Sequence, residues 1–225
     1  MTAAGDISVV IPARNAGRFL DDALRSVADQ TVCVGEVIVV DDGSHDDTAG
    51  IARRFDAPFA LRMIATAGAG AAAARNTGVR ASTGRLLAFL DADDIWLGDK
   101  LERQLAVPGL ADGAAIAFGF CREFSDPAGR FPIRDEQMAA PSLSSMLVAR
   151  SLFEQVGNFR EDLPGGELME WLGRPEASSL TTHYVQGAEF LRRVHANNST
   201  RSMAGGRRIY LELARARRRQ GLAAA

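Results

Sequence analysis

The sequence predicts an α/β fold with a mostly parallel central sheet and helices on both faces. In the N-terminal half, short β-branched apolar runs alternate with segments of helical periodicity. Strands that are separated by helices imply right-handed βαβ crossovers, and such crossovers build a parallel sheet that is covered on two sides. No internal repeat and no convincing linker interrupts the 225 residues.

The N-terminal half supplies most of the regular pattern. Strands are expected at Ile7–Ile11, Glu36–Val40, Leu61–Ala65 and Leu86–Leu90, of which the third is the weakest. Helices are expected at Arg18–Ala28, Asp46–Phe55 and Ala71–Ala81. The first of these helices places Phe19, Ala23, Leu24 and Val27 on one face, as an amphipathic helix requires.

The second half is less regular. We expect strands at Ala114–Phe120 and Leu143–Ala149, and short helices at Ser151–Val156 and Glu167–Leu172. Residues 125–129, Ser-Asp-Pro-Ala-Gly, are typical of a hairpin tip, and residues 163–166 of a flexible loop. A basic helix is expected at Arg207–Arg219.

Composition and charge restrict the class of protein. A formal net charge of −2 does not favour binding to nucleic acid. Cys33 and Cys121 lie in apolar segments and form no CxxC pair, so we expect buried thiols in a reducing compartment. Without a secretory signal pattern or a run of about 18 apolar residues, we expect a cytoplasmic protein. The arginines of residues 207–219 could still attach it to the inner face of a membrane or to a partner protein.

An acidic cluster follows the strand at Leu86–Leu90. Asp91, Asp93 and Asp94 lie within four residues, and like charges this close raise one another's pKa. A positive partner is therefore required. A hard divalent cation that also holds phosphate oxygens is the simplest candidate.

Two further strands of the predicted sheet also end in polar or turn-forming residues. Pro12-Ala-Arg-Asn15 follows the first strand and Asp41-Asp-Gly-Ser44 follows the second. Any one of these clusters could be turn chemistry. Because open α/β sheets bind ligands beyond the carboxyl ends of their strands, three such clusters at one edge favour a binding site.

Arg75 lies in the Ala-rich helix at Ala71–Ala81, where no local need for a cation is visible. Its guanidinium could hold a ligand phosphate, or it could pair with Asp42 or Asp91. Just before it, Gly68-Ala-Gly-Ala-Ala-Ala73 matches the dinucleotide-binding pattern G-x-G-x-x-A, with Asp91 about 20 residues later. That match is weak, because the preceding strand is poor and is the third in the chain.

Several stretches in this order resemble family 2 glycosyltransferases of the GT-A fold. They are Val9–Asn15, Ser26–Thr31, Glu36–Thr48, Gly70–Asp94, Trp96–Gln104, Ser144–Phe159, Gly166–Trp171 and Arg192–Asn198. The resemblance implies a single domain over residues 1–225. Residues 6–106 would form a nucleotide-sugar-binding half, residues 107–200 an acceptor and catalytic half, and residues 201–225 the basic helix.

The resemblance also implies roles for particular residues. Pro12, Ala13 and Arg14 would line the base pocket of a nucleotide-diphospho sugar, most often UDP-linked, and Asp42 would accept a hydrogen bond from the base. Arg75 would lie near the phosphates. Asp91, Ala92 and Asp93 would form the DxD motif, with Asp91 on the ribose or metal side and Asp93 binding Mn²⁺ or Mg²⁺ directly. His195 would touch the metal or the phosphate.

The catalytic base is where the sequence departs from the family pattern. Related enzymes commonly have Glu-Asp after a Gly-rich loop, and the second acid deprotonates the acceptor. Here the pair is Glu167-Leu168, and leucine cannot transfer a proton. Glu167 or Glu170 could take the role.

The sequence therefore predicts a metal-dependent, inverting glycosyltransferase that uses a UDP-sugar. Its acceptor could be a glycan, a lipid-linked sugar, a peptide or a small molecule. The alternatives are a non-catalytic GT-A-like nucleotide-binding module, a NAD-binding oxidoreductase built on residues 68–73, and a nucleotidyltransferase.

Overall fold

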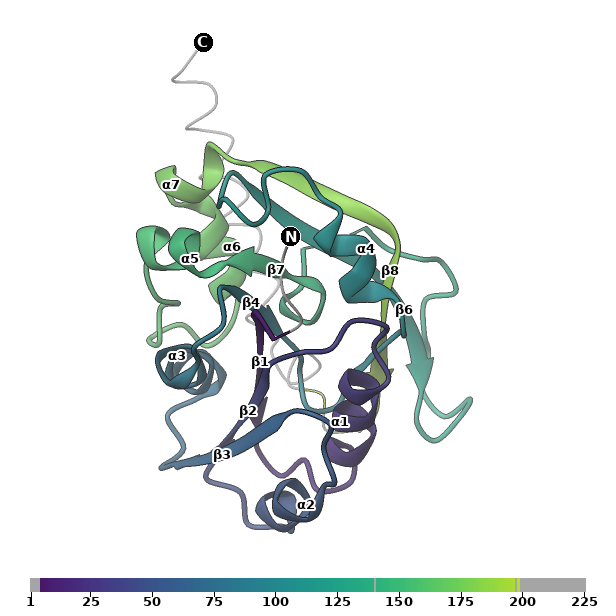
Figure 1. Ribbon diagram of the computed structural model, residues 1–225. Helices are drawn as coiled ribbons and strands as arrows, with labels where there is room; N and C mark the ends of the chain where they lie inside the picture. The colour runs from purple at the N-terminus through teal and green to yellow at the C-terminus, as the bar shows by residue number, and fades with distance from the viewer. Residues whose placement is uncertain (1–4, 140, 197, 199–225) are drawn as a thin grey trace.

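One mixed eight-stranded sheet forms the centre of the protein (Figure 1). The computed structural model describes residues 5–139, 141–196 and 198. The sheet has the strand order β3-β2-β1-β4-β7-β6-β8-β5. The strands are β1 (Ile7–Ala13), β2 (Glu36–Asp42), β3 (Ala60–Thr66), β4 (Leu86–Phe89), β5 (Ile95–Trp96), β6 (Ala115–Ser125), β7 (Leu147–Ala149) and β8 (Thr181–Val194).

The helices lie between these strands and pack on both faces. They are α1 (Leu20–Ala28), α2 (Thr48–Arg54), α3 (Ala71–Ala81), α4 (Lys100–Leu105), α5 (Arg150–Val156), α6 (Glu167–Gly173) and α7 (Pro175–Ser178), with a 3₁₀ turn, η1 (Leu143–Ser145). Figure 1 shows α3 on one side of the sheet and α1 and α4 on the other. Among the described residues, no helix is both long enough and apolar enough to cross a bilayer.

The first four strands pair as the sequence predicts. β1 pairs in parallel with β2 and β4, and β2 pairs in parallel with β3. β2 is buried on both faces. Val37 and Val39 belong to the main core, whereas Ile38 and Val40 pack against Ala74 of α3 in a second, small core. A parallel strand that is covered on both sides explains the unbroken apolar run of β2.

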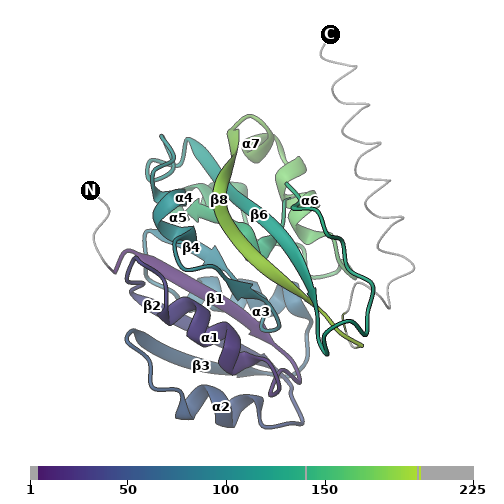
Figure 2. The ribbon, with the colours of Figure 1, turned by 90° about the vertical axis from the view of Figure 1, so that its right-hand side faces the viewer.

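The second half of the sheet mixes strand directions. β7 is antiparallel to β4 and β6, and β5 is antiparallel to β8, whereas β6 and β8 run in parallel. Figure 2 shows β6 and β8 side by side as two long, twisted ribbons. The antiparallel β4–β7 ladder joins the two halves, so one continuous sheet carries the carboxyl ends of β1, β2 and β4 and the segment after β8.

Several sequence expectations need correction. Leu143–Ala149 is not one strand, because η1 precedes the three-residue β7. The thiol of Cys33 is exposed, whereas that of Cys121 is buried as expected. The chain does turn after Ser125, but it returns with one isolated bridge, Cys121 to Met138, rather than as a regular hairpin. The basic helix expected at 207–219 lies outside the described residues.

Candidate functional site

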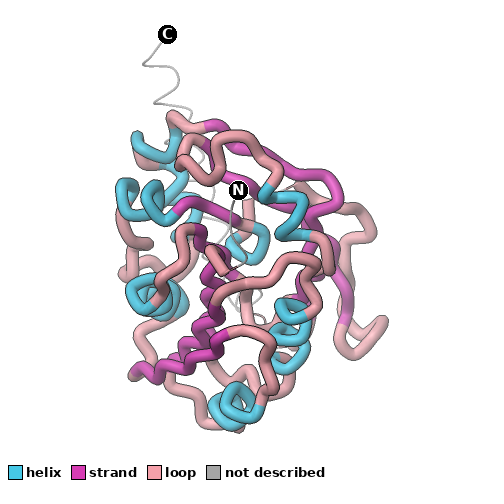
Figure 3. The backbone as a smooth tube through the Cα atoms, viewed as in Figure 1, coloured by secondary structure: helices cyan, strands magenta, loops and turns pink. Residues whose placement is uncertain are grey.

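The carboxyl ends of β1 and β2 form one side of the site. Pro12 and Ala13 end β1, and the exposed Arg14 follows them. In the parallel register Ala13 lies beside Asp41, so Asp42 ends its strand next to this segment. Figure 3 shows these strands in the middle of the fold, with helices on either side. The structure thus brings together the residues expected to bind a base.

Asp42 is buried and held by a ring of donors. Its Oδ1 accepts hydrogen bonds from the Thr66 hydroxyl at 2.7 Å and the Ala69 amide at 2.9 Å, and its Oδ2 accepts one from the Gly70 amide at 2.7 Å. Burial alone would raise the pKa of Asp42, but these donors and the positive charge of Arg14 outweigh it and lower the pKa. Asp42 is therefore a fixed carboxylate.

The same contacts explain the glycine pattern before α3. Gly68 and Gly70 have φ of 87° and 99°, a region that side chains disfavour. This conformation turns the Ala69 and Gly70 amides toward Asp42. A dinucleotide-binding loop would offer such amides to a pyrophosphate, whereas here a carboxylate of the protein accepts them.

Arg75 connects the two halves of the site. Its NH2 lies 2.5 Å from Asp91 Oδ1 and its NH1 lies 2.5 Å from Glu167 Oε1. The side chain is only 6% exposed. Burial would lower the pKa of Arg75, but the carboxylates of Asp91 and Glu167 raise it, so the guanidinium stays charged. Of the two ion pairs that the sequence left open, the one to Asp91 is formed.

Arg75 also carries an unsatisfied donor. Its Nε is buried and has no hydrogen-bond partner within the part of the chain that the structure describes. An unpaired buried donor costs free energy of about 1–3 kcal/mol, so such atoms point to a missing partner. A ligand oxygen could serve as that partner.

Asp93 lies in a second cluster, with the segment after β8. Its Oδ2 is 2.9 Å from His195 Nε2 and 3.3 Å from Asn198 Nδ2. His195 packs beside the ring of Phe19, which directly precedes α1, with ring centroids 4.6 Å apart. The Asp93 side chain keeps 31% of its surface exposed. Asp93 and His195 are therefore adjacent, and of the two side chains it is Asp93 that is partly open to a ligand.

Asp94 stabilises the acidic turn at residues 91–94 from the protein interior. It is buried, its Oδ2 accepts a hydrogen bond of 2.8 Å from Ser144 Oγ, and its Oδ1 accepts one of 3.2 Å from the Arg193 amide. Ser144 Oγ in turn accepts the Asp91 amide at 3.1 Å. Burial, Asp93 and Asp91 raise the pKa of Asp94 well above its usual value. Asp94 fixes the acidic turn instead of facing a ligand.

The Glu170 carboxylate is bound to Arg174 and not to the described residues of the site. Both of its carboxylate oxygens bind Arg174, four residues later, at 3.1 and 2.7 Å. Throughout residues 5–139, 141–196 and 198, it forms no hydrogen bond with Arg75, Asp91 or Asp93. Leu168, at the position of the family's usual acid, is buried in the core. Of the two candidate bases, only Glu167 contacts the site.

Two contributors were missed by sequence reasoning: Ser144 and Asn198. Asn198 belongs to the matched stretch at 192–198, so its place near His195 could have been suspected. Asn197 lies outside the described residues. Ser144 begins the matched stretch at 144–159, but its role could not be predicted, because it depends on η1 bringing its hydroxyl to Asp91 and Asp94.

The donor chemistry around Asp93 fits a hard divalent cation. Carboxylate oxygens and an imidazole nitrogen are ligands that Mn²⁺ and Mg²⁺ accept. In the described residues no group of three or more acidic, His or Cys side chains is preassembled for a metal. The protein would therefore supply a few ligands through Asp93, Asp91 and His195, and substrate phosphates and water would complete the shell.

Comparison with known proteins gives one family and one fold. The family model described as glycosyl transferase family 2 matches residues 8–160. WfgD of Escherichia coli, a UDP-Glc:α-D-GlcNAc-diphosphoundecaprenol β-1,3-glucosyltransferase, is 37% identical over 101 residues, which cover 45% of this chain and 40% of WfgD. AglE of Haloferax volcanii, a glycosyltransferase, is 32% identical over 185 residues, covering 75% of this chain and 60% of AglE.

The putative teichuronic acid glycosyltransferase TuaG of Bacillus subtilis is 40% identical over 101 residues, covering 44% of this chain and 40% of TuaG. The chain thus spans less than half the length of WfgD and of TuaG. Among solved structures, TarS 1–349 of S. aureus in complex with UDP-GlcNAc has a TM-score of 0.71 at 16% identity, covering 92% of this chain and 64% of that one. This similarity shows the GT-A fold.

Proposed function

The chain belongs to glycosyl transferase family 2, and from that premise we propose that it transfers a sugar from a nucleotide-diphospho sugar to an acceptor. The proposed donor is a UDP-sugar. Two relatives support this choice, since the name of WfgD specifies UDP-Glc and TarS was crystallised with UDP-GlcNAc. The proposed domain is single, with donor contacts in residues 6–106 and acceptor contacts in residues 107–200.

One observation carries the proposal. The Arg75 guanidinium lies 2.5 Å from a carboxylate oxygen of Asp91 and 2.5 Å from one of Glu167. Asp91 follows the donor-side strand β4, and Glu167 begins α6 on the acceptor side. A single rigid side chain thus holds the acid of the DxD motif beside the candidate base, which is the placement that a displacement between two bound substrates requires.

The nucleotide would bind at the ends of β1 and β2. Pro12, Ala13 and Arg14 would border the base. A carboxylate has about four lone-pair positions, and Asp42 uses three of them internally. The remaining position, on Oδ2, would accept a hydrogen bond from the base. The unpaired Arg75 Nε would meet a ribose or phosphate oxygen.

The diphosphate would lie over the turn Asp91-Ala92-Asp93. Mn²⁺ or Mg²⁺ bound there supplies Lewis-acid neutralisation of the leaving diphosphate. Asp93 and Asp91 would hold the cation with His195. The contacts of His195 with Phe19 and of Asn198 with Asp93 keep this cluster oriented.

The reaction would be a single displacement. Glu167 Oε1 is held by Arg75, and its Oε2 would receive the proton of the acceptor hydroxyl. The acceptor oxygen forms a bond to the anomeric carbon while the bond from that carbon to the β-phosphate oxygen breaks. The electron pair leaves on the diphosphate, and the configuration of the sugar inverts. Glu170 remains the second candidate base, because a local rearrangement could free it from Arg174.

The acceptor is proposed only by class: a glycan, a lipid-linked sugar, a peptide or a small molecule. A cytoplasmic location, with peripheral membrane or protein contact through residues 207–219, remains a proposal as well. A GT-A-like module that binds nucleotide without turnover is the alternative raised by Leu168.

Turnover of a donor panel tests the function. The protein is incubated with Mn²⁺ and UDP- or GDP-sugars, and nucleotide release is measured. We expect at least one UDP-sugar to be hydrolysed, and Glu167→Gln to reduce the rate on the order of 100-fold, because an oriented base contributes about that factor.

Glu170→Gln is the matched control and should change the rate less than Glu167→Gln does. UDP binding without release of sugar from any donor, unchanged by Glu167→Gln, would favour the non-catalytic alternative. Absence of both binding and release would reject the proposed function.

A further inference from the structure

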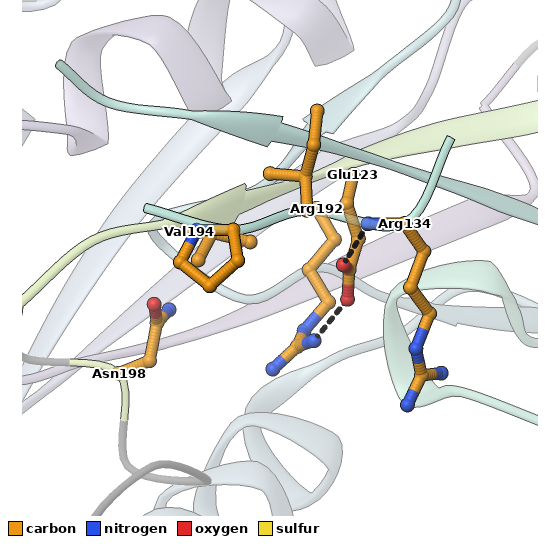
Figure 4. A pocket seen from close by; sticks show the side chains of 7 residues that line it. Glu123, Arg134, Arg192, Val194 and Asn198 are labelled. Carbon is orange, nitrogen blue, oxygen red and sulfur yellow. Dashed lines mark hydrogen bonds and ion pairs between the residues drawn. The ribbon is translucent and has the colours of Figure 1, made fainter. Parts of the chain in front are cut away.

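A hollow of about 300 Å³ opens beside the Asp93 cluster, on the acceptor half (Figure 4). Its polar lining consists of Glu123, Arg134, Arg192 and Asn198, and its apolar lining of Pro132, Ile133 and Val194. We call it the Arg134 hollow. It lies between the ends of β6 and β8 and the segment at residues 132–134.

The hollow adjoins the proposed diphosphate site. Asn198, which lines it, places its Nδ2 3.3 Å from Asp93 Oδ2. Val194, also in the lining, directly precedes His195. A group bound in the hollow would therefore lie one side chain away from the residues proposed to hold the cation.

A buried carboxylate organises the lining. The Glu123 side chain is only 7% exposed. Its Oε1 accepts a hydrogen bond of 2.6 Å from Arg192 NH1, and its Oε2 accepts one of 3.0 Å from the backbone amide of Arg134. Figure 4 shows the two guanidinium groups extending in the same direction past this carboxylate. Glu123 thus holds Arg192 through its guanidinium and Arg134 through its backbone amide.

The lining holds two guanidinium groups and one carboxylate, and that carboxylate, Glu123, is paired with Arg192. The side chain of Arg134 contacts the thioether of Met138, with NH1 2.8 Å from Sδ, and a thioether is a weak acceptor. In the described part of the chain no carboxylate forms an ion pair with this guanidinium. Beside it, Ile133 is 40% exposed, one of two large apolar side chains so exposed among those described.

We propose that the Arg134 hollow is an acceptor subsite that binds a phosphate group attached to an apolar portion. The Arg134 guanidinium matches an anion with several oxygens, because its fork can donate two parallel hydrogen bonds. Ile133, Pro132 and Val194 provide the adjoining apolar contact. The assignment of this phosphate to the acceptor rests on the proposed glycosyl transfer, which places the donor diphosphate at Asp93.

Titration calorimetry with phenyl phosphate tests the subsite, since this probe joins a phosphate to an apolar ring. It is titrated into the protein alone and into the protein saturated with UDP and Mn²⁺, so that the nucleotide site is filled in the second case. We expect binding in both cases and none with benzyl alcohol. Arg134→Met should weaken binding by about tenfold or more, and Arg134→Lys by less.

Arg130→Met is the matched control, because it removes the same charge from the same segment outside the hollow. It should leave the affinity for phenyl phosphate unchanged. Equal affinity of the wild-type protein and Arg134→Met for phenyl phosphate, or equal binding of benzoate and phenyl phosphate, would overturn the assignment. Loss of phenyl phosphate binding once UDP and Mn²⁺ are present would overturn it too, since the probe would then occupy the nucleotide site.

A separate UDP titration distinguishes the two proposals. UDP should bind wild type and Arg134→Met alike. If UDP does not bind while phenyl phosphate does so through Arg134, the proposed function fails and the anion site stands. If UDP binds and phenyl phosphate does not, the subsite fails alone.

Discussion

Lys100 is the single lysine of the chain, and it is fully buried. Its ammonium lies 4.1 Å from the centroid of the Trp96 ring, and it donates a hydrogen bond of 2.7 Å to Gln104 Oε1. Burial lowers the pKa of Lys100 to about 7, because the charged form loses its hydration. The folded protein therefore holds this amine partly neutral near neutral pH.

The lowered pKa of Lys100 makes the free energy of unfolding depend on pH. The unfolded chain keeps the lysine pKa near its ordinary value of about 10.4, above the folded value. Between pH 7 and 10 the unfolded state binds more protons, so the free energy of unfolding should rise with pH across that window and level off below it. The limiting slope is about 1.4 kcal/mol per pH unit.

Lys100→Met should remove the free-energy cost of burying an amine that is protonated in the unfolded chain. Removing the amine removes a protonation cost of roughly 4 kcal/mol at pH 7 but leaves the buried Gln104 Oε1 without its donor, so we expect the free energy of unfolding at pH 7 to increase by ~2 kcal/mol. Its rise between pH 7 and 10 should flatten, because methionine does not titrate. Urea denaturation at pH 7, 8 and 9 measures both effects. Arg103→Met, exposed on the same helix, should change stability by less than about 0.5 kcal/mol. An unaltered pH slope in Lys100→Met would show that the amine is charged throughout.

At the level of elements, the packing of α3 against β1 positions Arg75. Gly78 faces β1, and a Cβ at this position would overlap Val10 Cγ1, which is fully buried. The helix can approach the strand this closely only because residue 78 has no side chain. The same approach sets how far the Arg75 guanidinium reaches toward Asp91.

Gly78→Ala should destabilise the protein, since the overlap forces α3 away from the sheet. Overpacking of this kind costs about 1–3 kcal/mol, although alanine regains up to ~1 kcal/mol of helix propensity. Urea unfolding measures the difference. Gly173→Ala is the control, because its Cβ would meet nothing within 4 Å, and it should be neutral or stabilising. If Gly78→Ala were as stable as wild type, the packing of α3 against β1 would not require a glycine at position 78.

Elements whose apolar residues recur at one regular spacing could be predicted from the sequence. Elements in which that spacing is interrupted could not. The helix expected at Ala71–Ala81 is α3, residue for residue. β8 was missed because its register with β6 shifts between Phe118 and Phe120, opposite an irregular stretch of β8 that contains Gly187 with φ of 79°. A bulge reverses the alternation of side chains, so neither part shows a long enough pattern.

At the scale of the whole molecule, Arg193 ties three regions together. Its guanidinium binds Asp126 Oδ2 at 2.6 Å, Asp22 Oδ2 at 2.7 Å and the carbonyl oxygen of Asp93 at 3.0 Å. It also lies 4.8 Å from the ring centroids of Phe19 and Phe124. The end of β8 is thereby joined to α1, to the turn after β6 and to the acidic turn after β4.

Arg193→Met should loosen this junction. Breaking a buried ion-pair network typically costs about 3–5 kcal/mol, and the partial exposure of Asp22 and Asp126 places the expected loss near ~3 kcal/mol. Chemical denaturation measures it. Arg122→Met is the control, because its pair with Glu189 is half exposed and should contribute less than ~1 kcal/mol. Equal losses for the two variants would contradict a special role for Arg193.

The site could be predicted only in part, for a reason that belongs to the whole molecule. The clusters at 12–15, 41–44 and 91–94 lie at or just after the carboxyl ends of strands of one sheet, so their convergence could be predicted from the order of elements. Arg75 contacting Glu167 joins residues 92 positions apart, and His195 contacting Asp93 joins residues 102 apart. Such pairs depend on how β7, β6 and β8 extend the sheet, which no local pattern encodes. The contacts of Arg193 with Asp22 and Asp126 could not be predicted for the same reason.

Calorimetric titration of UDP, with Mn²⁺ or with EDTA, tests most directly the claim that Asp93 helps to hold a cation on a nucleotide diphosphate. The wild-type protein should bind UDP about tenfold or more tightly with Mn²⁺, and Asp93→Asn should lose that gain while matching the wild type in EDTA. Equal UDP affinity in both solutions, unchanged by Asp93→Asn, would contradict the account.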